Sequence, residues 1–248
     1  MMRYLGLFLV LALLVTGCAG GPFDRLQMSD QEEKEPTAHM DTVEALERYD
    51  FAALEDAMRG DDWNLRCQAA MVLVQRADLS PEQKADLLLY GLEQEIENPS
   101  QGMVPSGVYL TPSQYARRYL GDKLYHLEPD ILDLLRQRNE AASKDLQEHI
   151  QIALAYQGED AAVSVVRGLL ASDSVAVRMD AAAALAHLGD NQAMDDLERA
   201  LQDPHAVVTR SCTRVYRIYP VREAAARALR QLGVEVERLE DDTFQVKK

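Results

Sequence analysis

Arginine and tyrosine side chains gather in two segments of the sequence, and both residue types are typical of protein-binding hot spots. The stretch from His205 to Pro220 reads H-A-V-V-T-R-S-C-T-R-V-Y-R-I-Y-P, and its alternation of β-branched and polar residues predicts a small hairpin or extended loop. The earlier stretch, Asn98 to Pro112, contains three prolines and two glycines, which exclude a helix and leave a short strand at residues 108–110 as an option. The candidate partner-binding residues are Tyr109, Tyr115, Arg117, Arg210, Arg214, Tyr216, Arg217 and Tyr219.

The charge around the second segment departs from that of the chain as a whole. From His205 to Arg230 the sequence has six arginines and one acid, whereas Asp24 to Asp62 has thirteen acids and four bases. This composition fits a protein contact or an anion site, and it also fits a solvated loop whose arginines pair with nearby acids. The formal net charge of −15 argues against general nucleic-acid binding, which depends on neutralising phosphates.

Catalytic chemistry finds little support in the residue pattern. The five histidines fall in separate segments without metal-ligand spacing. The sequence contains no G-x-S-x-G, no H-E-x-x-H and no phosphate loop. Cys67 is a conceivable nucleophile, but no His/Asp partner is indicated, and we expect both Cys67 and Cys212 to be small buried residues. We therefore expect a protein that is not an enzyme and that holds no cofactor and no metal.

Repeated helices are the elements that must position the two segments. Val177 to Gly189, V-R-M-D-A-A-A-A-L-A-H-L-G, recurs as Val221 to Gly233, V-R-E-A-A-A-R-A-L-R-Q-L-G. The shared frame is V-R-x-x-A-A-x-A-L-x-x-L-G, and five copies begin at Leu65, Pro112, Leu146, Val177 and Val221, the second by a weak match. Two of the four intervals are longer by 10 to 16 residues, directly before the second helix. Both insertions should therefore project from one edge of a solenoid, which often marks the binding face.

The frame resembles HEAT repeats of the short type first noted in phycobilin lyases, and the resemblance covers most of residues 41–233. It implies an all-α fold, a right-handed α-α superhelix of HEAT/armadillo type with about five helix pairs and two non-helical insertions. Arg178 and Arg222 are expected to bond carbonyls or an acid of a neighbouring loop. The lyase members also leave a pigment-processing enzyme as the less favoured alternative.

The N-terminal residues predict where in the cell the protein is located. Residues 1–17 have one base, Arg3, and an apolar run too short to span a bilayer, which predicts a secretory signal. The run ends in Val15-Thr16-Gly17-Cys18, which resembles the bacterial lipoprotein lipobox. The resemblance implies cleavage before Cys18 and acylation of its sulfur, so that lipid anchors the chain in the membrane. Ala19 in place of Asp implies, by the sorting rule of diderm bacteria, the inner leaflet of the outer membrane, facing the periplasm.

The remaining boundaries follow from composition. Residues 18–40 are rich in Gly, Pro and acids and are expected to form a flexible tether. Residues 41–233 form the repeat domain, and residues 234–248 form a charged tail for which a weak hairpin and disorder are equal options. Together these features predict a monomeric, lipid-anchored scaffold or assembly adaptor that binds one or more envelope proteins, with a small-ligand or anion-binding module as the alternative.

Overall fold

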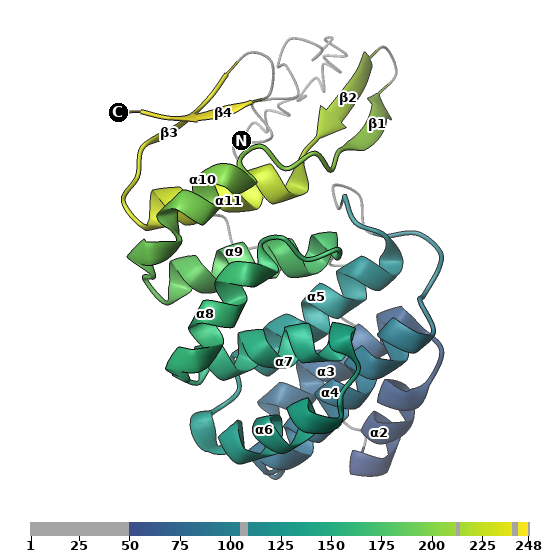
Figure 1. The fold of residues 1–248 in the computed structure, drawn as a ribbon. Coiled ribbons are helices and arrows are strands. Elements are labelled where there is room, and N and C mark those ends of the chain that lie inside the picture. Colours follow the sequence, from purple (N-terminus) through teal and green to yellow (C-terminus); the bar gives the residue numbers. More distant parts are fainter. Residues whose placement is uncertain (1–49, 105–108, 212–213, 240–242, 248) are drawn as a thin grey trace, which may run out of the picture. The chain divides into compact units, whose positions relative to one another are not determined.

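Helices that pair in sequence order build the described part of the chain (Figure 1). The computed structural model describes residues 50–248, apart from 105–108, 212–213, 240–242 and 248. All of these residues belong to one unit, residues 39–248. The predicted signal sequence, Cys18, the predicted tether and the expected start of the first helix at residues 41–49 lie outside the described residues.

Five helix pairs confirm the predicted solenoid. Each pair packs within itself, and the second helices pack in the order α3, α5, α7, α9, α11. The first helices are α2 (Phe51–Arg59), α4 (Pro81–Glu97), α6 (Leu132–Ala141), α8 (Asp160–Leu169) and α10 (Met194–Ala200). The second helices are α3 (Trp63–Gln75), α5 (Pro112–Tyr125), α7 (Lys144–Tyr156), α9 (Val175–His187) and α11 (Pro220–Gln231). Short 3-10 turns, η2 (Pro129–Ile131) and η3 (Asn191–Ala193), precede α6 and α10.

Local sequence signals set the helix ends. Ser80 and Thr111 form capping boxes with Gln83 and Gln114, and Pro stands at the first position of α4 and of α5. At the other end, Gly189 adopts a φ of 67° after α9. The amide of Asp190 donates to Leu185 O at 3.0 Å, so the chain leaves α9 through a Schellman turn.

The second position of the frame has the same structural role in all five copies. There, a side-chain donor bonds a backbone carbonyl at the end of the first helix of its own pair or just beyond it. Because this role recurs in copy two, it confirms the weak match at Pro112. The five bonds are Arg66 to Gly60 O, Ser113 to Glu95 O, Gln147 to Asn139 O, Arg178 to Ser172 O and Arg222 to Asp203 O.

The strands in the described part of the chain form two antiparallel hairpins. The hairpin expected in the second insertion is present, with β1 (Val207–Ser211) paired to β2 (Arg214–Ile218). The tail also forms a hairpin, β3 (Val236–Arg238) with β4 (Phe244–Val246), and both Val236 and Phe244 are buried in the core cluster. The optional strand in the first insertion is absent at Tyr109 and Leu110, and Val108 lies outside the described residues.

Candidate protein-binding surface

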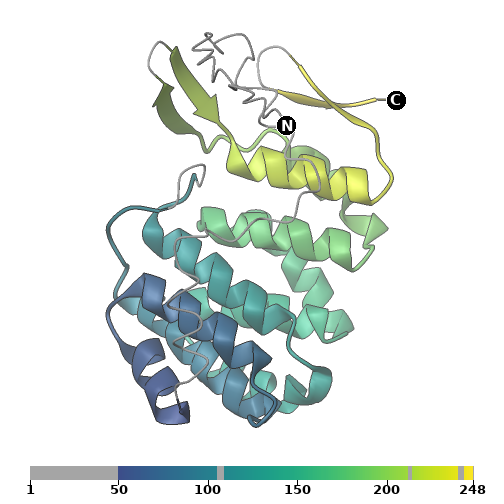
Figure 2. The ribbon, with the colours of Figure 1, turned by 180° about the vertical axis from the view of Figure 1, so that it is seen from behind.

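The two insertions share one edge of the helix array. One joins α4 to α5 and the other joins α10 to α11, so each connects the first helix of a pair to the second. Figures 1 and 2 show the loop before α5 and the β1–β2 hairpin leaving the helices on the same side. This agrees with the edge predicted from the repeat intervals.

The β1–β2 hairpin has one anchored face and one solvent face. Val207 pairs with Ile218, and Ile218 is 7% exposed. Val208 pairs with Arg217, and Val215 lies two residues before Arg217 on the same strand. Because alternate strand residues point to opposite faces, Val208, Val215 and Arg217 share the outer face, where the two valines are 58% and 62% exposed. β-Branched side chains beside an exposed arginine on this face are a surface that a partner can cover.

Tyr219 lies at the base of this hairpin, and Tyr216 is half-buried on β2. The Arg222 guanidinium lies over the Tyr219 ring, 3.9 Å from its centroid, and its Nε donates to Asp203 O at 2.7 Å. Sequence reasoning treated Arg222 as structural and Tyr219 as a contact residue, and the structure brings the two together. Two further candidate residues, Arg210 and Arg214, belong by backbone to β1 and β2.

An aromatic row stands beside the first insertion. Tyr115 contacts Trp63 edge-on at 5.8 Å and stacks with Tyr119 at 6.2 Å, and the Lys123 ammonium lies 4.9 Å from the Tyr119 centroid. Tyr109 in the loop is half-buried. Trp63 was not among the residues predicted to bind a partner. It is the only tryptophan in the sequence and directly follows the helix cap Asp62, and this position could have indicated an aromatic contact.

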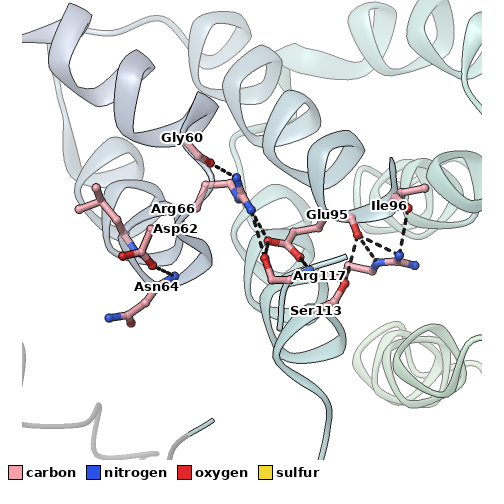
Figure 3. A network of polar contacts seen from close by, with 10 residues as sticks. Gly60, Asp62, Asn64, Arg66, Glu95, Ile96, Ser113 and Arg117 are labelled. Carbon is pink, nitrogen blue, oxygen red and sulfur yellow. Dashed lines mark hydrogen bonds and ion pairs between the residues drawn. The ribbon is translucent and has the colours of Figure 1, made fainter. Parts of the chain in front are cut away.

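The Arg117 guanidinium points toward the backbone of Glu95 and Ile96 near the end of α4 (Figure 3). Its Nη2 donates to Glu95 O at 2.9 Å and to Ile96 O at 3.5 Å, so it caps the C-terminal carbonyls of α4. Burial lowers the pKa of Arg117, with Asp145 and Glu95 acting in the opposite direction. Its guanidinium therefore stabilises the junction of α4 and α5, and the partner contact expected for it stays a prediction.

A buried ion pair holds the root of the first insertion (Figure 3). Arg66 pairs with Glu95, and the side chains of the two are 4% and 0% exposed. Ser100 at the start of the loop donates its hydroxyl to Glu95 at 2.7 Å. Since a buried carboxylate that loses its partners is strongly destabilising, this network fixes where the loop departs from α4.

A second buried network joins α5 to α9 across α7. The Arg118 Nε donates to Asp180 at 2.7 Å, and the Tyr125 hydroxyl lies 2.7 Å from His149 Nδ1 and 3.4 Å from Asp180. Burial raises the pKa of Asp180 to about 6, while Arg118 lowers it. Burial also lowers the pKa of His149 to about 3, so this ring is neutral at pH 7. Asp180 and His149 are 6% and 1% exposed and bond to one another through Tyr125, which makes them a structural bridge.

Cys67 is 5% exposed, and burial raises the pKa of its thiol well above the ordinary value. A buried thiol of this kind packs as a small apolar residue. Cys212 lies outside the described residues. In the part of the chain that the structure describes, no group of three or more His, Cys, Asp or Glu side chains is placed to hold a metal ion.

One described cavity opens between α2, α4 and α6, with a volume of about 350 Å³. Charged residues line it, and they pair with each other: Arg59 with Glu55 at 2.7 Å and Arg138 with Asp86 at 2.5 Å. Glu93 also lines the cavity and belongs to neither pair, so the charged lining has three acids and two bases. Among the described helices, none is both long and apolar enough to cross a membrane.

A family model described as HEAT repeats matches residues 129–217, which is less than half of the chain. The match begins at η2 and ends within β2, so it covers the third and fourth pairs and the start of the fifth. No curated protein matches the chain. The matched range therefore carries HEAT repeats, and the shared carbonyl bonds at the second frame position extend the same construction to both ends of the array.

Proposed function

We propose that this protein is a scaffold or assembly adaptor that binds another protein through the outer face of the β1–β2 hairpin. The observation that carries the proposal is the exposure of Val208 and Val215 beside Arg217 on a rigidly based hairpin. HEAT repeats are protein-interaction modules in general, and helix repeats of this kind offer extended binding surfaces. The aromatic row of Trp63, Tyr115 and Tyr119 is a second contact region on the array.

The binding free energy would come mainly from the apolar surface that the partner covers. Each valine that becomes fully buried contributes about 1 kcal/mol from its exposed half. Interface cores also favour arginine, which Arg217 supplies on the same outer face. Because Ile218 anchors the hairpin to the core, little order has to be imposed on binding, and this raises affinity.

The proposal places this scaffold in the bacterial cell envelope, anchored by lipid on Cys18. Support comes from the apolar run of residues 4–15 and the Val15-Thr16-Gly17-Cys18 motif. Two or three acyl chains hold a protein stably on a membrane, whereas one does not. The expected place is the inner leaflet of the outer membrane, facing the periplasm.

The contact surface is tested with a pair of matched substitutions. Val215→Asp places a charge on the hairpin face, and Val165→Asp makes the same change on α8, where Val165 is 44% exposed. Crosslinking mass spectrometry in native envelopes should show partners that are lost with Val215→Asp and kept with Val165→Asp. Both sites are exposed, so unfolding stability should change by less than about 0.5 kcal/mol. Identical partner sets for both variants would remove the hairpin as the contact.

The anchor is tested separately by metabolic labelling with an alkyne fatty acid. The wild type should incorporate label and fractionate with membranes, and Cys18→Ser should do neither. Label that persists in Cys18→Ser would refute acylation at this residue without bearing on the hairpin.

The alternative, a small-ligand or anion-binding module, predicts a different result. Thermal-shift screening with cell-wall fragments and anionic polymers would raise the melting temperature if one of them binds tightly. A shift that Arg217→Gln removes, together with unchanged protein partners, would favour that alternative.

A further inference from the structure

Two ion pairs between successive repeats are built in the same way. In the first and fourth repeats the arginine at the second frame position also binds a carboxylate from the following repeat. Arg66 pairs with Glu95 near the end of α4, and Arg178 pairs with Asp203 just after α10 at 2.8 Å. Both carboxylates come from the C-terminal end of the first helix of the next pair. The arginine thus ties one repeat to the next.

Arg222 holds the same position in the fifth pair, where the described elements after α11 are the strands β3 and β4 instead of another helix. Its Nε bonds Asp203 O and its plane lies on Tyr219, as described above. The carboxylate of Asp203 is already taken by Arg178. Among the residues that the structure describes, no carboxylate pairs with Arg222, and neither Nη nitrogen has a hydrogen-bond partner.

The described strands of the tail hairpin pack beside α11, and none of their carboxylates pairs with Arg222. Phe244 is 5% exposed and belongs to the core, so the hairpin covers apolar surface. Its polar contacts go elsewhere on α11: Arg238 pairs with Glu223 at 2.9 Å, and Arg230 donates to Val236 O at 3.0 Å. Glu223, the only acid between residues 205 and 230, is therefore occupied.

The geometry of Arg222 suits a carboxylate from outside. A guanidinium has five donors in a fixed planar fork, and its two Nη nitrogens can bind both oxygens of one carboxylate. The bond to Asp203 O and the stacking on Tyr219 already hold the fork in place. Such preorganisation lowers the entropic cost of binding. Arg222 is also only half exposed, so an ion pair there is less screened than one at a fully exposed arginine.

We propose that Arg222, held by Tyr219, binds a carboxylate side chain of the partner protein. The partner thereby takes the place that the end of a sixth repeat's first helix would occupy. The inference rests on the proposed scaffold function and names the chemistry of the partner: an acidic segment whose carboxylate contacts the base of the hairpin while neighbouring residues cover Val208 and Val215. Six arginines against one acid between His205 and Arg230 favour such an acidic segment, in a chain whose net charge is −15.

The test uses the protein's own ion-pair segment as the probe. A peptide of residues 197–206, L-E-R-A-L-Q-D-P-H-A, carries Asp203, the natural partner of Arg178. A labelled form and its Asp203→Asn version are titrated into the full lipidated chain in detergent micelles, and binding is followed by fluorescence anisotropy. The wild type should prefer the Asp peptide by about tenfold, as expected for a charge-assisted pair.

Arg222→Gln should abolish the preference, and Arg222→Lys should reduce it because the planar fork is lost. The matched control is Arg227→Gln, which removes an exposed arginine from the same helix and should leave the preference unchanged. Equal binding of the two peptides to the wild type would overturn the proposal, as would an equal loss in Arg227→Gln. Concentration-dependent self-association that Arg222→Gln abolishes would also overturn it, because the carboxylate would then come from a second copy of the chain. The peptide preference does not depend on Val215, so failure of the hairpin contact is seen separately.

Discussion

The buried pair Asp180 and His149 should give the protein two opposing pH dependences that cancel in the wild type. Burial raises the pKa of Asp180 to about 6 in the folded state, from an ordinary value of 3.8. Burial lowers the pKa of His149 to about 3, from 6.5. The two groups belong to one network through Tyr125, yet each can be replaced by an asparagine, whose amide does not titrate.

The sign of each effect follows from which state binds the proton. Between about pH 4 and pH 6 the folded state keeps a proton on Asp180 that the unfolded state has lost, so stability falls as the pH rises. In the same window the unfolded state carries a proton on His149 that the folded state lacks, so stability rises with pH. Each slope is about 1.4 kcal/mol per pH unit, which gives about 3 kcal/mol over two units, and the two contributions offset one another.

Single substitutions should reveal each slope. Relative to the wild type at each pH, Asp180→Asn should gain about 3 kcal/mol between pH 4 and pH 6, because only His149 is left. His149→Asn should lose a similar amount over the same range. Urea denaturation at half-unit pH steps measures both, and subtraction of the wild-type curve removes the surface carboxylates common to all three proteins.

The double variant serves as the control for this reasoning. With both groups replaced, the pH dependence should again run parallel to that of the wild type between pH 4 and pH 6, although the absolute stability will differ. A single variant that stays parallel to the wild type would show that its group does not titrate as its burial requires. That result would refute the conclusion that these groups are enclosed in a buried network between α5 and α9.

Three further substitutions probe packing at separate places. Gly121→Ala should destabilise the fold by about 1 to 3 kcal/mol in thermal melts, because the added Cβ would lie 2.6 Å from the Tyr125 hydroxyl; a neutral result would mean that the ring can move aside. Glu95→Ala should cost about 3 to 5 kcal/mol in urea unfolding by leaving Arg66 buried without its ion pair, and replacing both by apolar residues should recover most of that loss. Phe244→Ala should cost about 3 kcal/mol and raise hydrogen exchange across the tail, whereas a tail that does not pack on the core would show no change.

The repeat frame predicted the helix pairs because its signals are local. Alanine and leucine spacing marks the packed face, and Ser80-Pro81 and Gly189 mark where a helix begins and ends. The hairpin of the second insertion was predicted for the same reason, since alternation over residues 207–218 is a property of the strands themselves. The role of Arg178, bonded to a carbonyl and to Asp203, also followed from the frame.

Contacts between residues far apart in the sequence decide the structural features that local sequence patterns leave open. Arg117 lies in a segment rich in tyrosine, but the direction of its side chain depends on where α4 ends. Its guanidinium donates a hydrogen bond to Glu95 O. The tail strands have three residues each, too few for alternation to separate a hairpin from disorder, and burial of Phe244 in the core decides between them. The bridge from Arg118 to Asp180 spans 62 positions and depends on how the helices curve, which no repeat frame specifies.

The direction of the interrepeat ion pairs bears on how charge is distributed along the chain. Because the arginine of one repeat pairs with an acid of the next, these pairs have a direction, and among the described residues the arginine of the fifth pair has no carboxylate partner. Arg222 is that residue, and it lies at the base of the insertion that carries the two most exposed valines of the hairpin. A charge left unpaired by the repeat pattern and an apolar face left uncovered by the fold therefore stand together at one end. A partner that covers the valines and also binds Arg222 would gain from both contacts, because both would belong to the same interface.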